Sequence, residues 1–143
     1  MRAPHTRQQQ RAVTAHRLVE DRRPKRQDPN ESQGPTEAQD RAKAAFAKYK
    51  TFCMKGPTLL QQSGVMQTVA FCLSRDDDAA RGWIYDLQTL IGQANLARYA
   101  REAALPEYLA LSRDAIDAAV WLRRFAMSPP EGEATTRPQA DTE

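Results

Sequence analysis

Apolar residues recur every three or four positions along most of this chain, so each set falls on one face of an α-helix. No window shows the strict alternation of apolar and polar residues that marks a half-buried β-strand. A chain with only the first of these two periods lacks the pattern from which sheets are built. The sequence therefore predicts an all-α fold, a compact bundle of about five to seven helices with a disordered linker and a disordered C-terminal tail.

Helix boundaries are predicted from the apolar stripes and from residues that begin or end helices. The expected helices are 5–22, 36–55, a short one after Pro57, 65–74, one that Asp76–Asp78 opens and that reaches Ile91, 96–103, and 113–127. Gly64 is placed to end the short helix in a left-handed turn, Pro106 stops the segment 96–103, and Ser112 is a good N-cap. Segment 65–74 is apolar on nearly all sides, which predicts a central position in the bundle.

The domain organisation follows from length and composition. A chain of 143 residues favours a single domain. Two stretches combine proline, glycine and polar residues with almost no large apolar ones, namely PKRQDPNESQGP at 24–35 and the end of the chain from Ser128. We therefore expect one helical domain over 1–127, with a flexible linker at 24–37, and a disordered acidic tail over 128–143.

The cysteines and histidines predict neither a disulfide nor a metal site. Cys53 and Cys72 lie nineteen residues apart among apolar neighbours and without a CxxC motif, which predicts two buried free thiols in a reducing compartment. His5 and His16 lie on a separate polar segment, so no zinc site and no cofactor are expected. No apolar run approaches the ~18–20 residues of a membrane span, and the N-terminus has no signal-peptide pattern. We expect a cytoplasmic protein without membrane contact.

The net charge of +3 hides a strong segregation of charge along the chain. Residues 41–75 carry six basic side chains and no acidic one, and residues 1–26 carry eight basic and two acidic ones. The segment 27–40 between them carries four acids and no base. Folding does not require such segregation, and basic patches of this kind indicate a polyanionic partner.

The basic residues of the helix expected at 36–55 form two rows. On a helical wheel Arg41, Lys48 and Lys55 fall along one margin of the apolar face, and Lys43 and Lys50 fall along the other. A solvated helix whose lysine stems cover the rim of the core is one interpretation. The other is a surface that tracks the phosphates of a duplex, because the rows lack the interleaved aromatic residues that stack the bases of single strands.

No catalytic constellation is evident. The run Asp76–Asp78 is interpreted as the charge complement of a helix N-terminus rather than as a magnesium site. Neither a G-x-S-x-G context nor a patterned histidine accompanies the candidate nucleophiles Ser63, Ser74 and Ser112. Trp83 and Trp121 stand at helical core positions. The sequence therefore favours a protein without enzymatic activity.

Three segments together resemble a known family. They are QQQRAVTAHRLVED (8–21), KYKTFCMKGPTLLQQSGVMQTVAFCLSR (48–75) and DAIDAAVWLRRFAMS (114–128). In their order and spacing they are similar to the small subunit of type III-B CRISPR effector (Cmr) complexes, over roughly residues 7–127. The chain departs from that pattern in its longer, proline-rich linker, in its acidic tail, and at Val65 and Met66, where the family more often has a leucine and a small residue.

The resemblance implies a non-catalytic, compact helical subunit of an antiviral ribonucleoprotein. Such subunits stack head to tail and lie along the duplex of guide RNA and target RNA, which they hold through its sugar-phosphate backbone. The implied partners are therefore guide and target RNA, other Cmr subunits and neighbouring copies of the chain. The residues expected to bind RNA are Lys48, Lys50, Lys55, Arg41, Lys43, Arg7 and Arg11. Those expected to contact a neighbouring copy are Arg123 and Arg124.

Two alternatives remain open at the level of the sequence. The first is the small subunit of the related type III-A complex, against which the element WLRRFA at 121–126 speaks. The second is a stand-alone helical nucleic-acid-binding protein such as a helix-turn-helix protein. Its recognition helix would need exposed Arg, Asn or Gln side chains, whereas VMQTVAFCLS at 65–74 is apolar.

Overall fold

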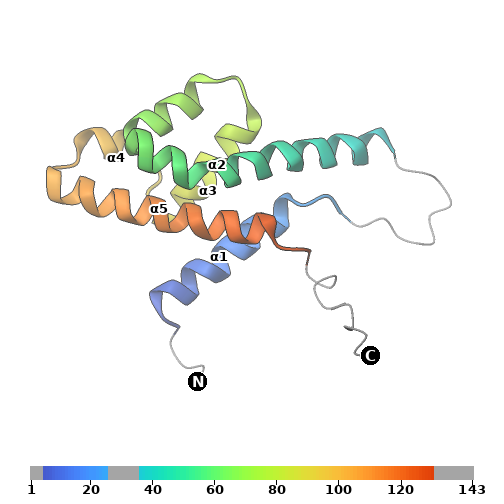
Figure 1. Cartoon of the computed structure of the whole chain (residues 1–143), viewed down its shortest axis with the longest axis horizontal. Helices are drawn as coiled ribbons and strands as arrows, with labels where there is room; N and C mark the ends of the chain where they lie inside the picture. Colours follow the sequence, from blue (N-terminus) through green and yellow to red (C-terminus); the bar gives the residue numbers. More distant parts are fainter. Residues whose placement is uncertain (1–4, 26–35, 131–143) are drawn as a thin grey trace, which may run out of the picture.

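The computed structural model describes residues 5–25 and 36–130, which form five helices and no strand (Figure 1). The helices are α1 (Arg7–Arg22), α2 (Glu37–Ser74), α3 (Asp78–Ile91), α4 (Leu96–Glu102) and α5 (Leu105–Met127). The predicted all-α class is confirmed. Most of the expected linker 24–37 and of the expected tail 128–143 lies outside the described residues.

The two longest helices, α2 and α5, run side by side, and α1 lies below α5 in the view of Figure 1 and packs against α5 and α3. Both α1 and α2 begin with a capping box in which a threonine and the glutamine three residues later satisfy free backbone groups. The pairs are Thr6 with Gln9 and Thr36 with Gln39. The core between the helices is built from buried side chains of every element, with Trp83, Leu87 and Leu122 fully enclosed.

α2 does not end near residue 55, so that predicted boundary is wrong. The helix continues through Pro57, which is buried inside it together with Gly56. A proline inside a helix costs one backbone hydrogen bond. Here tertiary packing outweighs that loss, because the indole of Trp83 lies directly against the backbone at Gly56.

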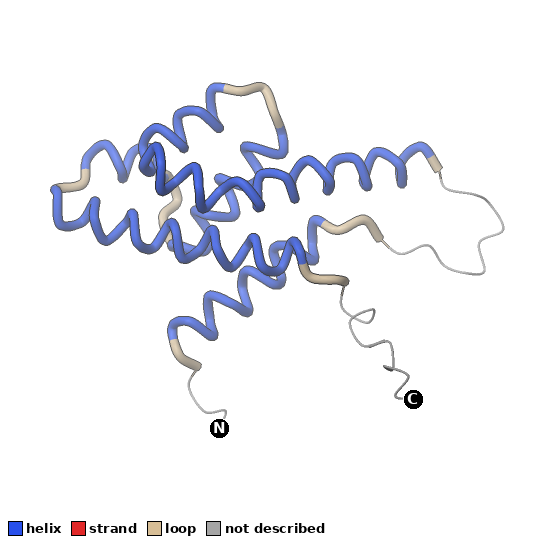
Figure 2. Tube along the Cα trace, viewed as in Figure 1, coloured by secondary structure: helices blue, strands red, loops and turns tan. Residues whose placement is uncertain are grey.

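The break in α2 falls at Gly64, where the chain reverses and the second part of the helix folds back (Figure 2). Gly64 has a positive φ of 77°, as expected, but its ψ of 168° is not that of the predicted left-handed helical turn. This backbone region is essentially restricted to glycine. The reversal is supported by the Thr68 hydroxyl, which donates a hydrogen bond of 3.1 Å to the Leu59 carbonyl.

The prediction that segment 65–74 occupies the centre of the bundle is wrong. Val65, Val69 and Cys72 are buried on one side of it. The opposite side carries exposed apolar residues, with Phe71 at 45% and Leu73 at 43% exposure. The segment is therefore an outer element whose second apolar face has no partner among the described residues.

α5 begins at Leu105 rather than at the predicted cap Ser112. Pro106 stands in the first turn of α5, where a proline is tolerated because its missing N–H would have no partner in the helix. The Ser112 hydroxyl instead donates a hydrogen bond of 2.9 Å to the Tyr108 carbonyl within the helix. The interpretation of the acidic run is confirmed at Asp77, whose side chain accepts hydrogen bonds from the backbone of Ala79 and Ala80.

Cys53 and Cys72 are buried free thiols, as predicted. Burial raises the pKa of Cys53 to about 12 and that of Cys72 to about 11. Within the described residues no group of three or more His, Cys, Asp or Glu side chains is placed to hold a metal ion. None of the helices in this part of the chain is long and apolar enough to cross a membrane.

Candidate nucleic-acid interface

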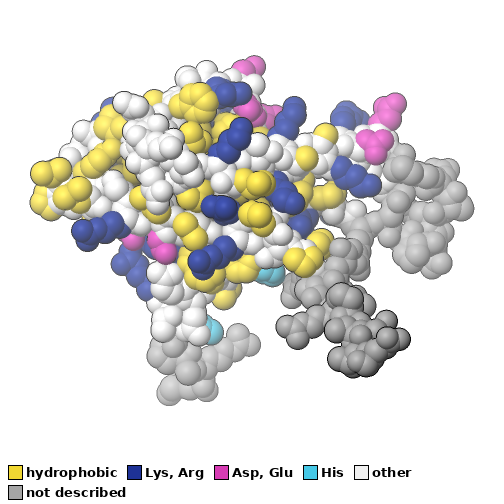
Figure 3. Space-filling model, in the orientation of Figure 1, with side chains coloured by type: hydrophobic (Ala, Val, Ile, Leu, Met, Phe, Trp, Pro, Cys, Tyr) yellow, Lys and Arg dark blue, Asp and Glu magenta, His cyan; other side chains and the backbone are white. Residues whose placement is uncertain are grey.

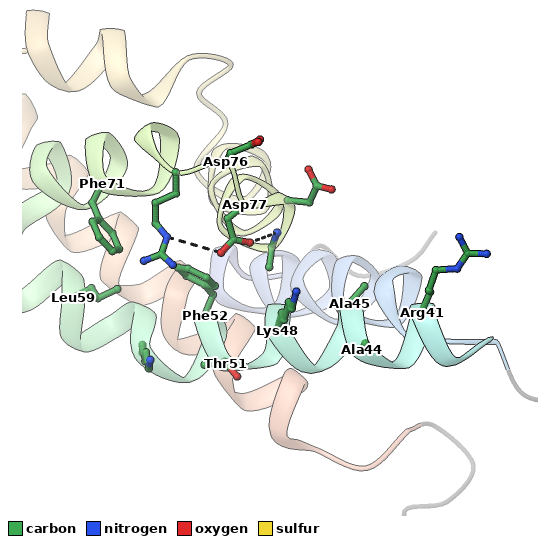
Figure 4. Close-up of a pocket in the computed structure, with 14 residues that line it drawn as sticks. Arg41, Ala44, Ala45, Lys48, Thr51, Phe52, Leu59, Phe71, Asp76 and Asp77 are labelled. Atoms are coloured by element: carbon green, nitrogen blue, oxygen red, sulfur yellow. Dashed lines mark hydrogen bonds and ion pairs between the residues drawn. The ribbon is translucent and has the colours of Figure 1, made fainter. Parts of the chain in front are cut away.

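A groove of about 1280 Å³ lies between the first part of α2 and the turn that joins α2 to α3 (Figure 4). It is lined by Arg41, Ala44, Ala45, Lys48, Thr51, Phe52, Lys55, Leu59, Phe71, Arg75, Asp76, Asp77, Asp78 and Ala79. The row Arg41, Lys48 and Lys55 thus shares one groove, in agreement with the helical wheel. Since the reversal at Gly64 returns the chain beside its own earlier turns, the opposite wall also comes from the end of α2.

The wall opposite that row carries charges of both signs. Arg75 adds a fourth cation that the sequence had not assigned to any site, and its guanidinium lies 5.2 Å from the centre of the Phe71 ring. Its contact with the Asp77 carboxylate is long, at 3.9 Å. Asp76 and Asp78 line the same wall, and their carboxylates accept no hydrogen bond from any other described residue. The groove therefore combines cations, carboxylates and an apolar floor.

Lys43 and Lys50 do not line this groove, which places the second predicted row on a separate margin of α2. Lys43 is exposed and Lys50 is half-buried. No carboxylate of the described residues forms an ion pair with any cation of the two rows. These cations are therefore available to an external anion on the described surface.

A buried polar cluster holds the first part of α2 against α1 and α3. The Asp86 carboxylate is 1% exposed and accepts hydrogen bonds from Arg22 at 2.6 and 3.0 Å and from the Tyr49 hydroxyl at 2.5 Å. Burial raises the pKa of Tyr49, and Cys53 and Asp86 add to the rise. Burial by itself lowers the pKa of Arg22, but the hydrogen bond and charge of Asp86 raise it overall. The sequence reasoning missed this cluster, although an Asp in the apolar stripe of α3 is a signal for it.

The two N-terminal candidates differ in accessibility. Arg11 is 8% exposed and pairs with Asp117 at 2.5 Å and with Asp114 at 3.4 Å. Its guanidinium is thus committed to the contact between α1 and α5, which leaves little of it for an RNA phosphate. Arg7 is 75% exposed and makes one pair of 3.4 Å with Asp114.

The candidates on α5, Arg123 and Arg124, are both exposed. The guanidinium of Arg124 lies 5.5 Å from the centre of the Trp121 ring, and that ring stacks on Phe125. Trp121 is half-buried, with its Nε1–H donating to the Gln8 side chain at 2.9 Å, whereas Trp83 is fully buried as expected for a core residue. Figure 3 shows lysine and arginine side chains spread over the face that α2 and α5 share, with apolar side chains between them.

The fold and this surface define a class of protein. It is a small helical bundle with a basic, acid-poor face and, in the part of the chain that is described, no cluster of side chains arranged to bind a metal. Such a face is suited to bind a polyanion through its charge.

Comparison with known proteins places the chain within this class. The family model for CRISPR-associated protein (Cas_Cmr5) matches residues 7–128. The CRISPR system Cmr subunit Cmr5 of Thermus thermophilus is 38% identical over 84 residues, which cover 57% of this chain and 74% of that protein. The crystal structure of a CRISPR-associated Cmr5 family protein from the same species matches with a TM-score of 0.66 and 32% identity, over 86% of this chain and 96% of that one. The chain belongs to the Cmr5 family, the small subunits of type III-B (Cmr) CRISPR systems, as its sequence motifs predicted.

Proposed function

We propose that this chain is a non-catalytic small subunit of a type III-B CRISPR effector complex, and that it holds the duplex of guide RNA and target RNA through the sugar-phosphate backbone. The observation that carries the proposal is the set of five cations on the first part of α2, none of which pairs with a carboxylate of the described residues. Family membership supplies the context, a Cmr-type CRISPR system. A guide-dependent antiviral role in the cytoplasm is part of the proposal.

The spacing of the cations suits a backbone contact. Seven residues advance an α-helix by about 10.5 Å, so Arg41, Lys48 and Lys55 span about 21 Å along one margin. Point charges repeated over that length meet phosphates without reading base edges, and the guide itself supplies sequence specificity by pairing. The buried cluster around Asp86 supports this role, because it fixes the rotation of α2 and therefore the direction in which both rows point.

Assembly with other chains is the second part of the proposal. Copies of one subunit that stack along a duplex contact each other through two different surfaces of the molecule, which is a head-to-tail arrangement. Arg123 and Arg124 are exposed near the end of α5 and are available for a contact with a neighbouring copy. The remaining partners are the other subunits of the Cmr complex, which carry the catalytic work.

The experiment compares charge reversals in the assembled complex. Changing Lys48, Lys50 and Lys55 together to Glu should lower the affinity for target RNA by at least about tenfold. It should also reduce the slope of log K against log salt by up to about 3, since each lost phosphate contact contributes about 0.9. The matched control changes Arg81, Arg98 and Arg101 to Glu, three exposed cations on α3 and α4. An affinity and a salt slope equal to those of the control would contradict the proposed surface.

A further inference from the structure

The groove holds two aromatic side chains, of which the sequence did not place Phe71 beside the cations. Phe52 and Phe71 are nineteen residues apart, and both line the groove together with Lys48 and Lys55 (Figure 4). They meet because α2 reverses at Gly64. Phe71 is 45% exposed, so much of its surface remains accessible to a ligand. The sequence favoured a surface for duplexes alone because no aromatic residues alternate with the cations along the basic helix. In the folded chain, however, aromatic rings do lie beside these cations.

An aromatic floor flanked by cations is the arrangement on which unpaired bases bind. The base stacks on the ring while the neighbouring phosphates meet Lys or Arg side chains. In a duplex the faces of the bases are already covered by their neighbours, so a duplex has nothing to stack on Phe71. Arg75 lies over this ring at 5.2 Å, and among the described residues its one ion pair is the 3.9 Å contact with Asp77. Such an exposed pair costs little to break, so a base can take its place and release Arg75 to a phosphate.

The carboxylates on the opposite wall indicate which part of a nucleotide faces them. The carboxylates of Asp76 and Asp78 have no hydrogen-bond donor among the described residues, and an ionised carboxylate only accepts hydrogen bonds. Phosphates would be repelled there, whereas the amino group on the edge of a cytosine, adenine or guanine is a suitable donor. Uracil has no amino group, and its single N3–H lies between two carbonyl oxygens that the carboxylates repel, so this wall favours the other bases. The groove is also large enough, since about 1280 Å³ exceeds the ~300–1,000 Å³ of ordinary small-molecule sites.

We propose that this groove binds an unpaired, amino-bearing nucleotide of RNA. Its base stacks on Phe71, its amino edge faces Asp76 and Asp78, and its flanking phosphates meet Lys48 and Lys55. The inference rests on the proposed function and extends it, because the same subunit then holds paired RNA along its basic face and a nucleotide outside the duplex in the groove.

The test uses the full chain and short RNAs of defined structure at low salt, with binding followed by fluorescence anisotropy. The probes are a cytidine 12-mer, a uridine 12-mer and a 12-base-pair RNA duplex. The variant Phe71→Leu keeps an apolar side chain but removes the stacking ring. It should weaken binding of the cytidine strand by about 5- to 140-fold, the range of one base–aromatic stack, and leave binding of the duplex unchanged. Leu73→Ala is the matched control, because Leu73 is 43% exposed on the same helical segment and does not line the groove.

A second variant tests the carboxylate wall. Wild type should bind the cytidine strand more tightly than the uridine strand, and the double variant Asp76→Asn and Asp78→Asn should bind the two equally. The groove is not a site for an unpaired base if the Phe71→Leu variant binds the cytidine strand as tightly as wild type does. The same conclusion follows if the variant loses affinity for the duplex to the same extent as for the cytidine strand. The proposed function then still stands on the response of the duplex to the lysine reversals. Failure of both single-stranded RNAs to bind the wild-type chain would overturn the groove as a nucleotide site, whereas the proposed function is judged separately by the response of the assembled complex to the lysine reversals.

Discussion

Replacement of Asp86 measures how firmly the basic helix is set on the bundle. This carboxylate joins three elements, because it accepts hydrogen bonds from Arg22 on α1 and Tyr49 on α2 while it belongs to α3. The variant Asp86→Asn keeps the shape of the side chain and removes its charge. Asp86→Ala also opens a cavity at a site that is 1% exposed.

The magnitude follows from the contacts. Removal of one partner from a buried ion pair costs about 3–5 kcal/mol, and the lower end applies here because Arg22 is 31% exposed and water screens its charge. We therefore expect Asp86→Ala to lower the free energy of unfolding by about 3 kcal/mol or slightly more, and Asp86→Asn by about 2 kcal/mol. At about 4 °C per kcal/mol for a chain of this size, the melting temperature should fall by roughly 8–12 °C.

The assay is urea unfolding followed by circular dichroism at 222 nm, with a double-mutant cycle that adds Arg22→Gln to Asp86→Asn. Because the two groups are in direct contact, the cycle should give a coupling free energy of about 1 kcal/mol or more. Single-variant losses below about 0.5 kcal/mol, or losses that simply add, would refute a structural role for this cluster. The matched control is Asp114→Asn, whose carboxylate is 30% exposed and pairs with Arg7 and Arg11 only at 3.4 Å.

Two further predictions concern the turn in α2 and the buried thiols. Gly64→Asn should lower the free energy of unfolding by about 1–3 kcal/mol, since the backbone angles φ 77° and ψ 168° are essentially restricted to glycine. Gly92→Asn should leave it nearly unchanged, because φ 80° and ψ 27° are angles that Asn readily adopts. Equal melting temperatures of the two variants would exclude backbone strain at Gly64. The raised pKa values of Cys53 and Cys72, about 12 and about 11 against an ordinary 9.0, mean that the unfolded chain loses the thiol protons first. The free energy of unfolding should therefore fall as the pH rises above about 9, and replacement of both cysteines by Ala should reduce this fall; an identical pH dependence would contradict it.

The two proposals give the groove and the basic face separate experimental signatures. Lysine reversals report on charge and change the salt dependence, whereas Phe71→Leu reports on stacking and leaves the net charge unchanged. A subunit that responds to both uses one helix for two kinds of RNA contact.

The local pattern of the sequence determined the helical class, most of the helix boundaries, the two rows of cations and membership in the Cmr5 family. Each of these depends on residues within a few turns of one another, and spacing along the chain records such relations directly. The rows Arg41, Lys48, Lys55 and Lys43, Lys50 are predictable for this reason, since seven residues return to nearly the same face of any α-helix.

Tertiary structure alone decided which apolar residues are covered and which charges are free. Segment 65–74 is apolar on nearly all sides, yet the neighbouring helices cover only one side of this segment, and Phe71 on its other side stays exposed. Arg11 belongs to a basic segment, but its guanidinium forms an ion pair with Asp117, which lies 106 residues further along the chain. Phe71 lies beside the cations of α2 only because the chain reverses at Gly64. Contacts between distant residues depend on how helices pack, and packing leaves no period in the sequence.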